Sequence, residues 1–91
     1  MAAVQRKTDA NNGGGVISST AQSTVYANSK LISVNGSTVA THPAGAGVHA
    51  GATTANGSST VFAGGIAINR TGDADSCTHA RIGGSSDVFV G

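Results

Sequence analysis

Apolar and polar positions alternate over short stretches of this chain, and no window carries apolar residues at the i, i+3, i+4 and i+7 positions of an amphipathic helix. Glycine, serine, threonine and asparagine interrupt every segment, which is typical of short strands joined by turns. The stretch STVYANSKLISVNGS at 23–37 recurs as STVFAGGIAINRTGD at 59–73, and a third copy begins with SDVFVG at 86–91. The pattern therefore predicts an all-β protein built from a repeated unit.

Each copy of the repeat has the features of a β-hairpin. A valine followed by an aromatic residue gives the alternation of a half-buried strand. Two turn residues follow, Asn28-Ser29 in the first copy and Gly64-Gly65 in the second, and the glycine pair suits the positive φ angles of a tight turn better. Return strands are expected at Leu31 to Val34 and at Ile66 to Arg70.

A single hairpin of this kind cannot bury its apolar face, so the copies are expected to pack around a common axis. Val25, Val61 and Val88 hold equivalent positions and would converge on one small core. The chain, 1–91, is then a single domain of pseudo-threefold symmetry. Its expected units are a degenerate first unit at about 1–22, full units at 23–58 and 59–85, and a closing strand at 86–91.

The composition limits the size of that core and the kinds of partner. With no tryptophan, two phenylalanines and one tyrosine in 91 residues, the core must be thin. Small domains of this kind usually add disulfides, a structural metal or a partner, and a single cysteine excludes an internal disulfide. The five basic residues are scattered and the net charge is +1, so the sequence does not predict a basic patch that would bind nucleic acid or an anionic membrane. Without a membrane-spanning stretch or a signal peptide, the chain is expected to be made in the cytoplasm.

Four side chains in the two connecting segments can bind a metal ion: His42, His49, Cys77 and His79. Thr41-His42 and Thr78-His79 are expected at the same place in the repeat, so that the two loops would point their side chains at one centre. Three imidazoles and one thiolate make a closed tetrahedral zinc site, which is structural because no coordination position stays open. A chain with so thin a core could depend on one such ion for folding.

Cys77 and its neighbours also allow other interpretations. An enzyme would use Cys77 as nucleophile, His79 or His42 as base and Asp75 as the orienting carboxylate. We expect no enzyme, because so few large side chains can hardly enclose a pocket for a small-molecule substrate. A free thiol without a special role is the other alternative. The segment Gly13-Gly14-Gly15 lacks the GKS or GKT ending of a phosphate-binding loop and is interpreted as a flexible or turn segment.

The Ser-x-Val-aromatic hairpins, Arg70 two residues before Gly72-Asp73, and the Cys-x-His loop together resemble the PAAR-repeat proteins. The resemblance covers about Ser23 to Gly91, and more loosely the N-terminal residues. The tetrapeptide that names the family would fall on Ala67 to Arg70, where only Arg70 agrees. Arg70 and Asp73 could also form an ion pair near the second hairpin.

The resemblance implies a small conical β-protein with a broad face and a pointed, metal-clamped tip. The metal would be zinc, with iron as the alternative. The family often has a metal-binding histidine in its first loop, and TDANNGGG here has none, so His42 and His49 must both come from the middle loop. Together with Cys77 and His79 they would complete the ligand set.

The function that the resemblance implies is mechanical. The broad face would cap the blunt end of a trimeric β-helical spike in a contractile injection apparatus, and the tip would pierce the target-cell membrane and enter its envelope. We favour the tail baseplate of a phage virion over a type VI secretion spike. The alternative from another class is a freestanding β-solenoid that binds a surface such as ice or glycan. That protein would need ladders of constant period, whereas the copies begin at the unequally spaced residues 23, 59 and 86.

Overall fold

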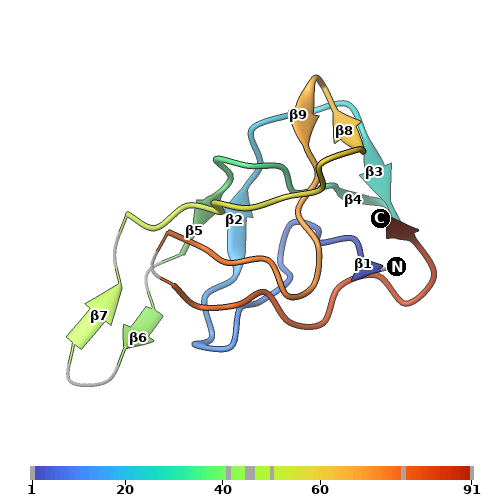
Figure 1. Cartoon of the computed structure of the whole chain (residues 1–91). Helices are drawn as coiled ribbons and strands as arrows, with labels where there is room; N and C mark the ends of the chain where they lie inside the picture. The colour runs from blue at the N-terminus through green and yellow to red at the C-terminus, as the bar shows by residue number, and fades with distance from the viewer. Residues whose placement is uncertain (1, 41, 45–46, 50, 77, 91) are drawn as a thin grey trace.

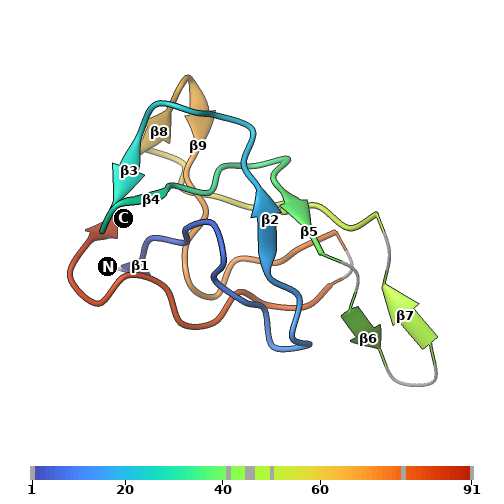
Figure 2. The same cartoon turned by 180° about the vertical axis from the view of Figure 1, so that it is seen from behind.

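The computed structural model describes residues 2–40, 42–44, 47–49, 51–76 and 78–90, with the backbone alone for 42–44 and 47–49. In these residues the chain forms strands, turns and bends without a helix, which confirms the all-β prediction. Accordingly, this part of the chain offers no helical segment with the length and hydrophobicity of a membrane span. The molecule is elongated, with principal extents of 36 × 23 × 23 Å (Figures 1 and 2).

The described strands are two or three residues long and form antiparallel pairs. The pairs are β1 (Ala2–Ala3) with β10 (Phe89–Val90), β2 (Ile17–Ser19) with β5 (Thr38–Val39), β3 (Tyr26–Ala27) with β4 (Lys30–Leu31), β6 (His42–Ala44) with β7 (Gly47–His49), and β8 (Phe62–Ala63) with β9 (Ile66–Ala67). An isolated two-stranded ladder is at best marginally stable in water. The fold therefore depends on the contacts between ladders.

Two of these pairs, β3–β4 and β8–β9, are hairpins of the same kind, and they lie together with the β1–β10 pair in what we call the hairpin end (β1, β3, β4, β8, β9 and β10; Figure 1). The β3–β4 turn has φ angles of 55° at Asn28 and 66° at Ser29, and the β8–β9 turn has 59° at Gly64 and 81° at Gly65. Two consecutive positive φ angles are typical of a tight type I′ hairpin turn, so both turns occur where the sequence predicts them. The third pair joins the two ends of the chain.

The strands β1, β4 and β9 each lead into a segment that we call a ring segment. The ring segments are residues 4–6, 32–34 and 68–70. Their central residues form a closed cycle of backbone hydrogen bonds: Gln5 N–H donates to Asn69 O (3.0 Å), Asn69 N–H to Ser33 O (3.0 Å), and Ser33 N–H to Gln5 O (2.9 Å). All three residues are 0% exposed. Each segment is the donor to one neighbour and the acceptor from the other, so the ring leaves no free strand edge.

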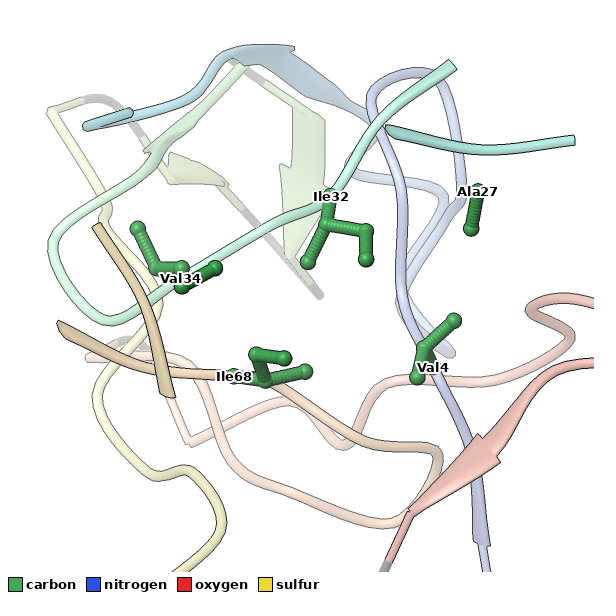
Figure 3. Packing of buried hydrophobic residues seen from close by; sticks show 6 residues of the cluster. Val4, Ala27, Ile32, Val34 and Ile68 are labelled. Carbon is green, nitrogen blue, oxygen red and sulfur yellow. The ribbon is translucent and has the colours of Figure 1, made fainter. Parts of the chain in front are cut away.

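The apolar core is built by these ring segments and hairpins. Figure 3 shows Val4, Ile32 and Ile68, one from each ring segment, pointing toward a common centre. The buried cluster consists of aliphatic side chains, namely Val4, Ala27, Ile32, Val34, Ala63 and Ile68. Val25, Val61 and Val88, the residues predicted to be equivalent, are partly buried and pack against it. The core is thus thin and shared among the repeats.

Each ring segment ends in a turn that is closed by a polar side chain. Arg70 N–H donates to Asp73 Oδ2 (2.7 Å), and the carboxylate also forms the predicted ion pair with the Arg70 guanidinium, at 2.8 Å. Arg6 and Asp9 repeat this arrangement, with an ion pair of 2.9 Å. In each pair the hydrogen bond to the carboxylate raises the pKa of the arginine above its usual value. Near the surface such pairs add little to stability, and here they mainly fix the turns.

Candidate metal centre

Three loops form the second region of the molecule, which we call the loop end (residues 11–15, 39–52 and 75–79). Each loop is closed by an equivalent backbone hydrogen bond: Asn11 N–H to Gly15 O (2.9 Å), Val39 N–H to Ala52 O (2.9 Å), and Asp75 N–H to His79 O (2.8 Å). The β6–β7 hairpin of the middle loop projects away from the hairpin end (Figures 1 and 2). The sequence predicts the middle and third loops as repeat-equivalent connections, and the hydrogen bonds add the first loop as their counterpart.

The bases of the three loops are bonded to one another in a second cycle. Asn12 N–H of the first loop donates to Ala80 O beside the third loop (2.9 Å), and Ser76 N–H of the third donates to Thr53 O beside the middle loop (2.7 Å). The middle loop returns to the first, because Ala40 N–H donates to Val16 O (2.8 Å). The fold thus brings together the segments that carry the four predicted ligands.

The middle loop differs from the others because it contains an inserted hairpin. Judged by the closing hydrogen bonds, the counterpart of His79 in the middle loop is Ala52, since each provides the accepting carbonyl at the end of its loop. His42 lies on β6, inside the insertion. The expectation that His42 and His79 hold the same place in the repeat is therefore wrong, because the insertion shifts the numbering between the two loops.

The inserted hairpin places His42 and His49 opposite each other. The register pairs His42 with His49, Pro43 with Val48 and Ala44 with Gly47. Directly opposite positions of an antiparallel pair have Cβ atoms about 4.5–5.5 Å apart on one face of the ladder. The backbone therefore supplies two neighbouring histidine positions from a single hairpin, which is what the sequence requires if the first loop contributes none.

His79 is half-buried, and its imidazole lies directly against Gly13 of the first loop. A Cβ atom at Gly13 would stand only 2.3 Å from His79 Cε1, 2.5 Å from Nδ1 and 2.7 Å from Nε2. Gly13 does not have a left-handed φ, so it is the space for the ring, rather than the backbone conformation, that requires glycine here.

A buried ion pair lies at the base of the loops. Arg81 Nη1 donates to Asp75 Oδ2 at 2.8 Å, and both side chains are 0% exposed. Arg81 also donates to Gln5 Oε1 (3.1 Å) and to the carbonyl oxygens of Asp9 (2.7 Å) and Gly15 (3.1 Å). A guanidinium with this many partners joins the third loop to the first ring segment and to the first loop.

Asn11 completes this network from the first loop. Its Nδ2 is a second donor to Asp75 Oδ2, at 2.8 Å, and its Oδ1 accepts the N–H groups of Gly13 (2.9 Å) and Gly15 (2.8 Å). The side chain of Asn11 therefore fixes the fold of its own glycine-rich loop and the position of the Asp75 carboxylate at the same time. The segment interpreted from sequence as a flexible or turn segment is a turn held in place by buried hydrogen bonds.

Two features of the third loop are typical of functional sites. Asp75 Oδ1 is buried and has no hydrogen-bond partner among the described residues. A buried carboxylate oxygen without a donor is unfavourable, and such an atom is explained by strain, a bound water or ion, or a functional role. Thr78, between Cys77 and His79 in the sequence, has a φ of 73°, which is strained for a β-branched residue.

The donor set that the sequence proposes suits zinc, since imidazole nitrogen and thiolate sulfur are its preferred ligands, and it also accepts iron. Cys77 lies outside the described residues, and of the four proposed ligands His79 is the one whose side chain is described. Among the described side chains no three His, Cys, Asp or Glu residues form a metal-binding group. The cluster of His42, His49, Cys77 and His79 therefore stays a prediction, supported by the loop arrangement.

The sequence interpretation missed Asn11, Gly13 and Arg81. Arg81 is equivalent to Ile17 and Thr54 in the repeat, because the three residues make the same backbone hydrogen bond. The N–H of Arg81 donates to Asp73 O, that of Ile17 to Asp9 O and that of Thr54 to Ser37 O. These three residues hold equivalent buried positions, with exposures of 1%, 0% and 3% respectively. A charged residue at a position that is otherwise uncharged in the repeat needs a buried partner, and that partner is Asp75.

Comparison with known proteins does not identify an activity. The sequence matches no known protein family, and no curated protein is similar enough to count as a relative. The described residues enclose no pocket. Function is therefore inferred from the residues and their arrangement.

Proposed function

We propose that the protein is the tip of a central spike in a contractile injection apparatus, in the first place a phage tail baseplate. There it would cap the blunt end of a trimeric β-helical protein and pierce the target membrane without catalysis. The observation that carries this proposal is the closed cycle of hydrogen bonds among the three ring segments. Three equivalent strand pairs around one axis can make the same contact with each of three identical partner chains.

The hairpin end has an exposed aromatic side chain on each of its three repeats. Tyr26, Phe62 and Phe89 hold equivalent positions, one residue after the inward-facing valines, and are 59%, 56% and 46% exposed. Large exposed apolar side chains that recur on one region of a surface are typical of protein interfaces. We infer that this end is the broad face that binds the spike.

The loop end would be the point of a conical molecule. Polar contacts between Arg81, Asp75 and Asn11 lie there beside the buried apolar residues Ile17, Val39 and Ala52. A metal ion held by His79, Cys77 and the middle hairpin would tie the loops together where few apolar side chains are available. Zinc is the proposed ion, with iron as the alternative. The same arrangement would serve a type VI secretion spike, which is the alternative apparatus.

The spike-binding role is tested with trimeric β-helical spike proteins of contractile injection apparatuses, from phage tails and from type VI secretion systems. Size-exclusion chromatography with light scattering should show one copy of this protein per spike trimer. The variant Tyr26→Ser/Phe62→Ser/Phe89→Ser removes the three aromatic groups and should weaken the complex at least tenfold, since each lost aromatic contact removes about 1 kcal/mol or more.

The matched control is Val16→Ser/Ile82→Ser, which removes two exposed apolar side chains, 37% and 47% exposed, that adjoin the loops instead. This variant should bind the spike as the wild type does. Failure of the wild type to bind any such trimer, or binding of three copies per trimer, would contradict the proposed role.

A further inference from the structure

We propose that Asn56 is a site of spontaneous deamidation, at which the backbone nitrogen of Gly57 attacks the side-chain amide and water completes the conversion to aspartate or isoaspartate. The proposal rests on a comparison of the three Asn-Gly pairs in the chain, at 12–13, 35–36 and 56–57. It depends neither on the proposed metal site nor on the proposed spike partner.

The reaction needs an available backbone nitrogen after the asparagine. This nitrogen loses its proton and bonds to Cγ of the asparagine, the bond from Cγ to Nδ2 breaks, and ammonia leaves with the proton. Water then opens the resulting succinimide ring at either carbonyl, which gives aspartate or isoaspartate without an oxidant or a reductant. A backbone N–H that already donates a hydrogen bond must lose that bond first, so such a pair reacts more slowly.

Two of the three glycine N–H groups are held in this way. Gly13 N–H donates to Asn11 Oδ1 at 2.9 Å, and Gly36 N–H donates to Thr54 O at 3.0 Å. The side chain of Asn35 is held as well, because its Oδ1 accepts a hydrogen bond of 2.8 Å. The fold therefore opposes the reaction at the first and second Asn-Gly pairs.

The third pair lacks this protection. Among the described residues no atom accepts the N–H of Gly57, and none bonds to the exposed side chain of Asn56. The backbone around the reacting atoms is nevertheless fixed, since Asn56 N–H donates to Ala74 O (3.2 Å) and Gly57 O accepts Arg70 Nη2 (3.3 Å). A Cβ atom at Gly57 would stand only 2.8 Å from Ile68 O. The fold thus requires the glycine that makes Asn56 reactive.

Modification at Asn56 should reach the ring segments. The carbonyl oxygen of Asn56 accepts Asn69 Nδ2, and Asn69 is the central residue of the ring segment 68–70, with 0% exposure. Isoaspartate lengthens the backbone by one carbon atom and moves this carbonyl, while Ala74 still holds the N–H on the other side. We therefore expect the bond to Asn69 to weaken and the protein to unfold at a lower urea concentration.

The experiment is incubation of the folded full-length protein at neutral pH, with tandem mass spectrometry of tryptic peptides at intervals. Deamidation should be at least about fivefold faster at Asn56 than at Asn12 or Asn35, which is the factor for one net hydrogen bond. In urea the three rates should become similar, because the contacts that protect two of the pairs are lost. Labelling by an isoaspartyl methyltransferase identifies the isoaspartate product.

The matched control is Asn56→Gln, which keeps an exposed amide but reacts slowly because its attack would close a six-membered ring. Its urea midpoint should stay constant during incubation, whereas that of the wild type should fall; if it does not fold, Asn56→Ser serves the same purpose. Equal rates at the three pairs in the folded protein, or a faster reaction at Asn12 or Asn35, would overturn the site. Complete conversion at Asn56 with an unchanged midpoint would overturn its effect on the ring segments.

Discussion

The hairpin end and the loop end of this molecule are built from the same three repeats, yet they are stabilised differently. At the hairpin end each repeat makes the same contacts, and aliphatic side chains fill the space between the ring segments. At the loop end the three loops differ in sequence and the middle one is longer, and a buried ion pair with its hydrogen bonds joins the first and third loops. The repeated end accounts for the fold, whereas the divergent end contains the residues suited to a specific site.

The clearest example is one position of the repeat. Ile17, Thr54 and Arg81 are equivalent by their backbone hydrogen bonds and are all buried. The same buried position is therefore filled by an aliphatic side chain in one repeat, by a hydroxyl side chain in another and by a charged side chain in the third. Only the charged one needs a buried partner of opposite charge, which Asp75 provides.

The largest effect is expected from Arg81→Met, which removes the cation of the loop end. Asp75 would then be a buried charge without its main partner, and loss of one partner of a buried pair usually costs about 3–5 kcal/mol. Urea unfolding monitored by circular dichroism measures the change in free energy of unfolding. The double variant Arg81→Met/Asp75→Leu should recover much of the loss. A double variant as unstable as the single one would show that the charge pair is not what the loop end depends on.

Metal removal should also act on the loop end. If free zinc is about 1,000 times its Kd, the ion adds about 4 kcal/mol to the free energy of unfolding, and excess EDTA should remove this amount. Cys77→Ser should lower zinc affinity and bring the stability of the zinc-treated protein close to that of the EDTA-treated wild type. Thermal melting with and without zinc measures both effects. An unchanged melting temperature after chelation, with no zinc or iron by elemental analysis, would contradict the site.

The corresponding change at the hairpin end is Ile32→Ala. Ile32 is 5% exposed and belongs to the core cluster, so its truncation should cost about 2–5 kcal/mol. Its effect should stay separate from metal binding, and zinc affinity of the folded variant should equal that of the wild type. A reduced affinity would show that the two ends are coupled and that the division between them is incomplete.

A smaller, stabilising effect is expected at the β3–β4 turn. Ser29 has a φ of 66°, where the equivalent residue of β8–β9 is Gly65 with 81°. Ser29→Gly converts this turn to the favoured Asn-Gly pair and should raise the free energy of unfolding by about 0.5–1 kcal/mol. The control, Gly65→Ser, should lower it by a similar amount. Equal stability of all three proteins in urea would mean that the two hairpins are not equivalent.

The smallest effect concerns pH near the β1–β10 pair. Hydrogen bonds from Asn28 and Ser85 lower the pKa of Asp87 below its usual value. A carboxyl with a lower pKa in the folded state stabilises it at neutral pH, and the contribution is lost as the pH falls through the folded pKa, below about pH 4. Asp87→Asn should therefore flatten the acid side of the stability profile slightly. An identical profile would exclude this contribution.

The strands and turns of the hairpin end could be predicted from the sequence because the residues that determine them are close together in the chain. A valine, an aromatic residue and a two-residue turn lie within one short stretch, and the turns at Asn28-Ser29 and Gly64-Gly65 occur as expected. The loop end depends on contacts between loops that are far apart in sequence, such as Asn11 with Asp75. The pattern of apolar and polar residues along the chain does not predict such a contact. The insertion in the middle loop similarly made His42 look equivalent to His79, although the hydrogen bonds align His79 with Ala52.

The most direct test of the central claim is a crystal structure of the zinc-treated protein with anomalous scattering measured on both sides of the zinc absorption edge. We expect one strong peak at the loop end, with the nitrogen atoms of His42, His49 and His79 at about 2.0–2.1 Å from the zinc ion and the sulfur of Cys77 at about 2.3 Å from it. Absence of a peak at the loop end, or a peak bound by other residues, would contradict a metal-clamped tip.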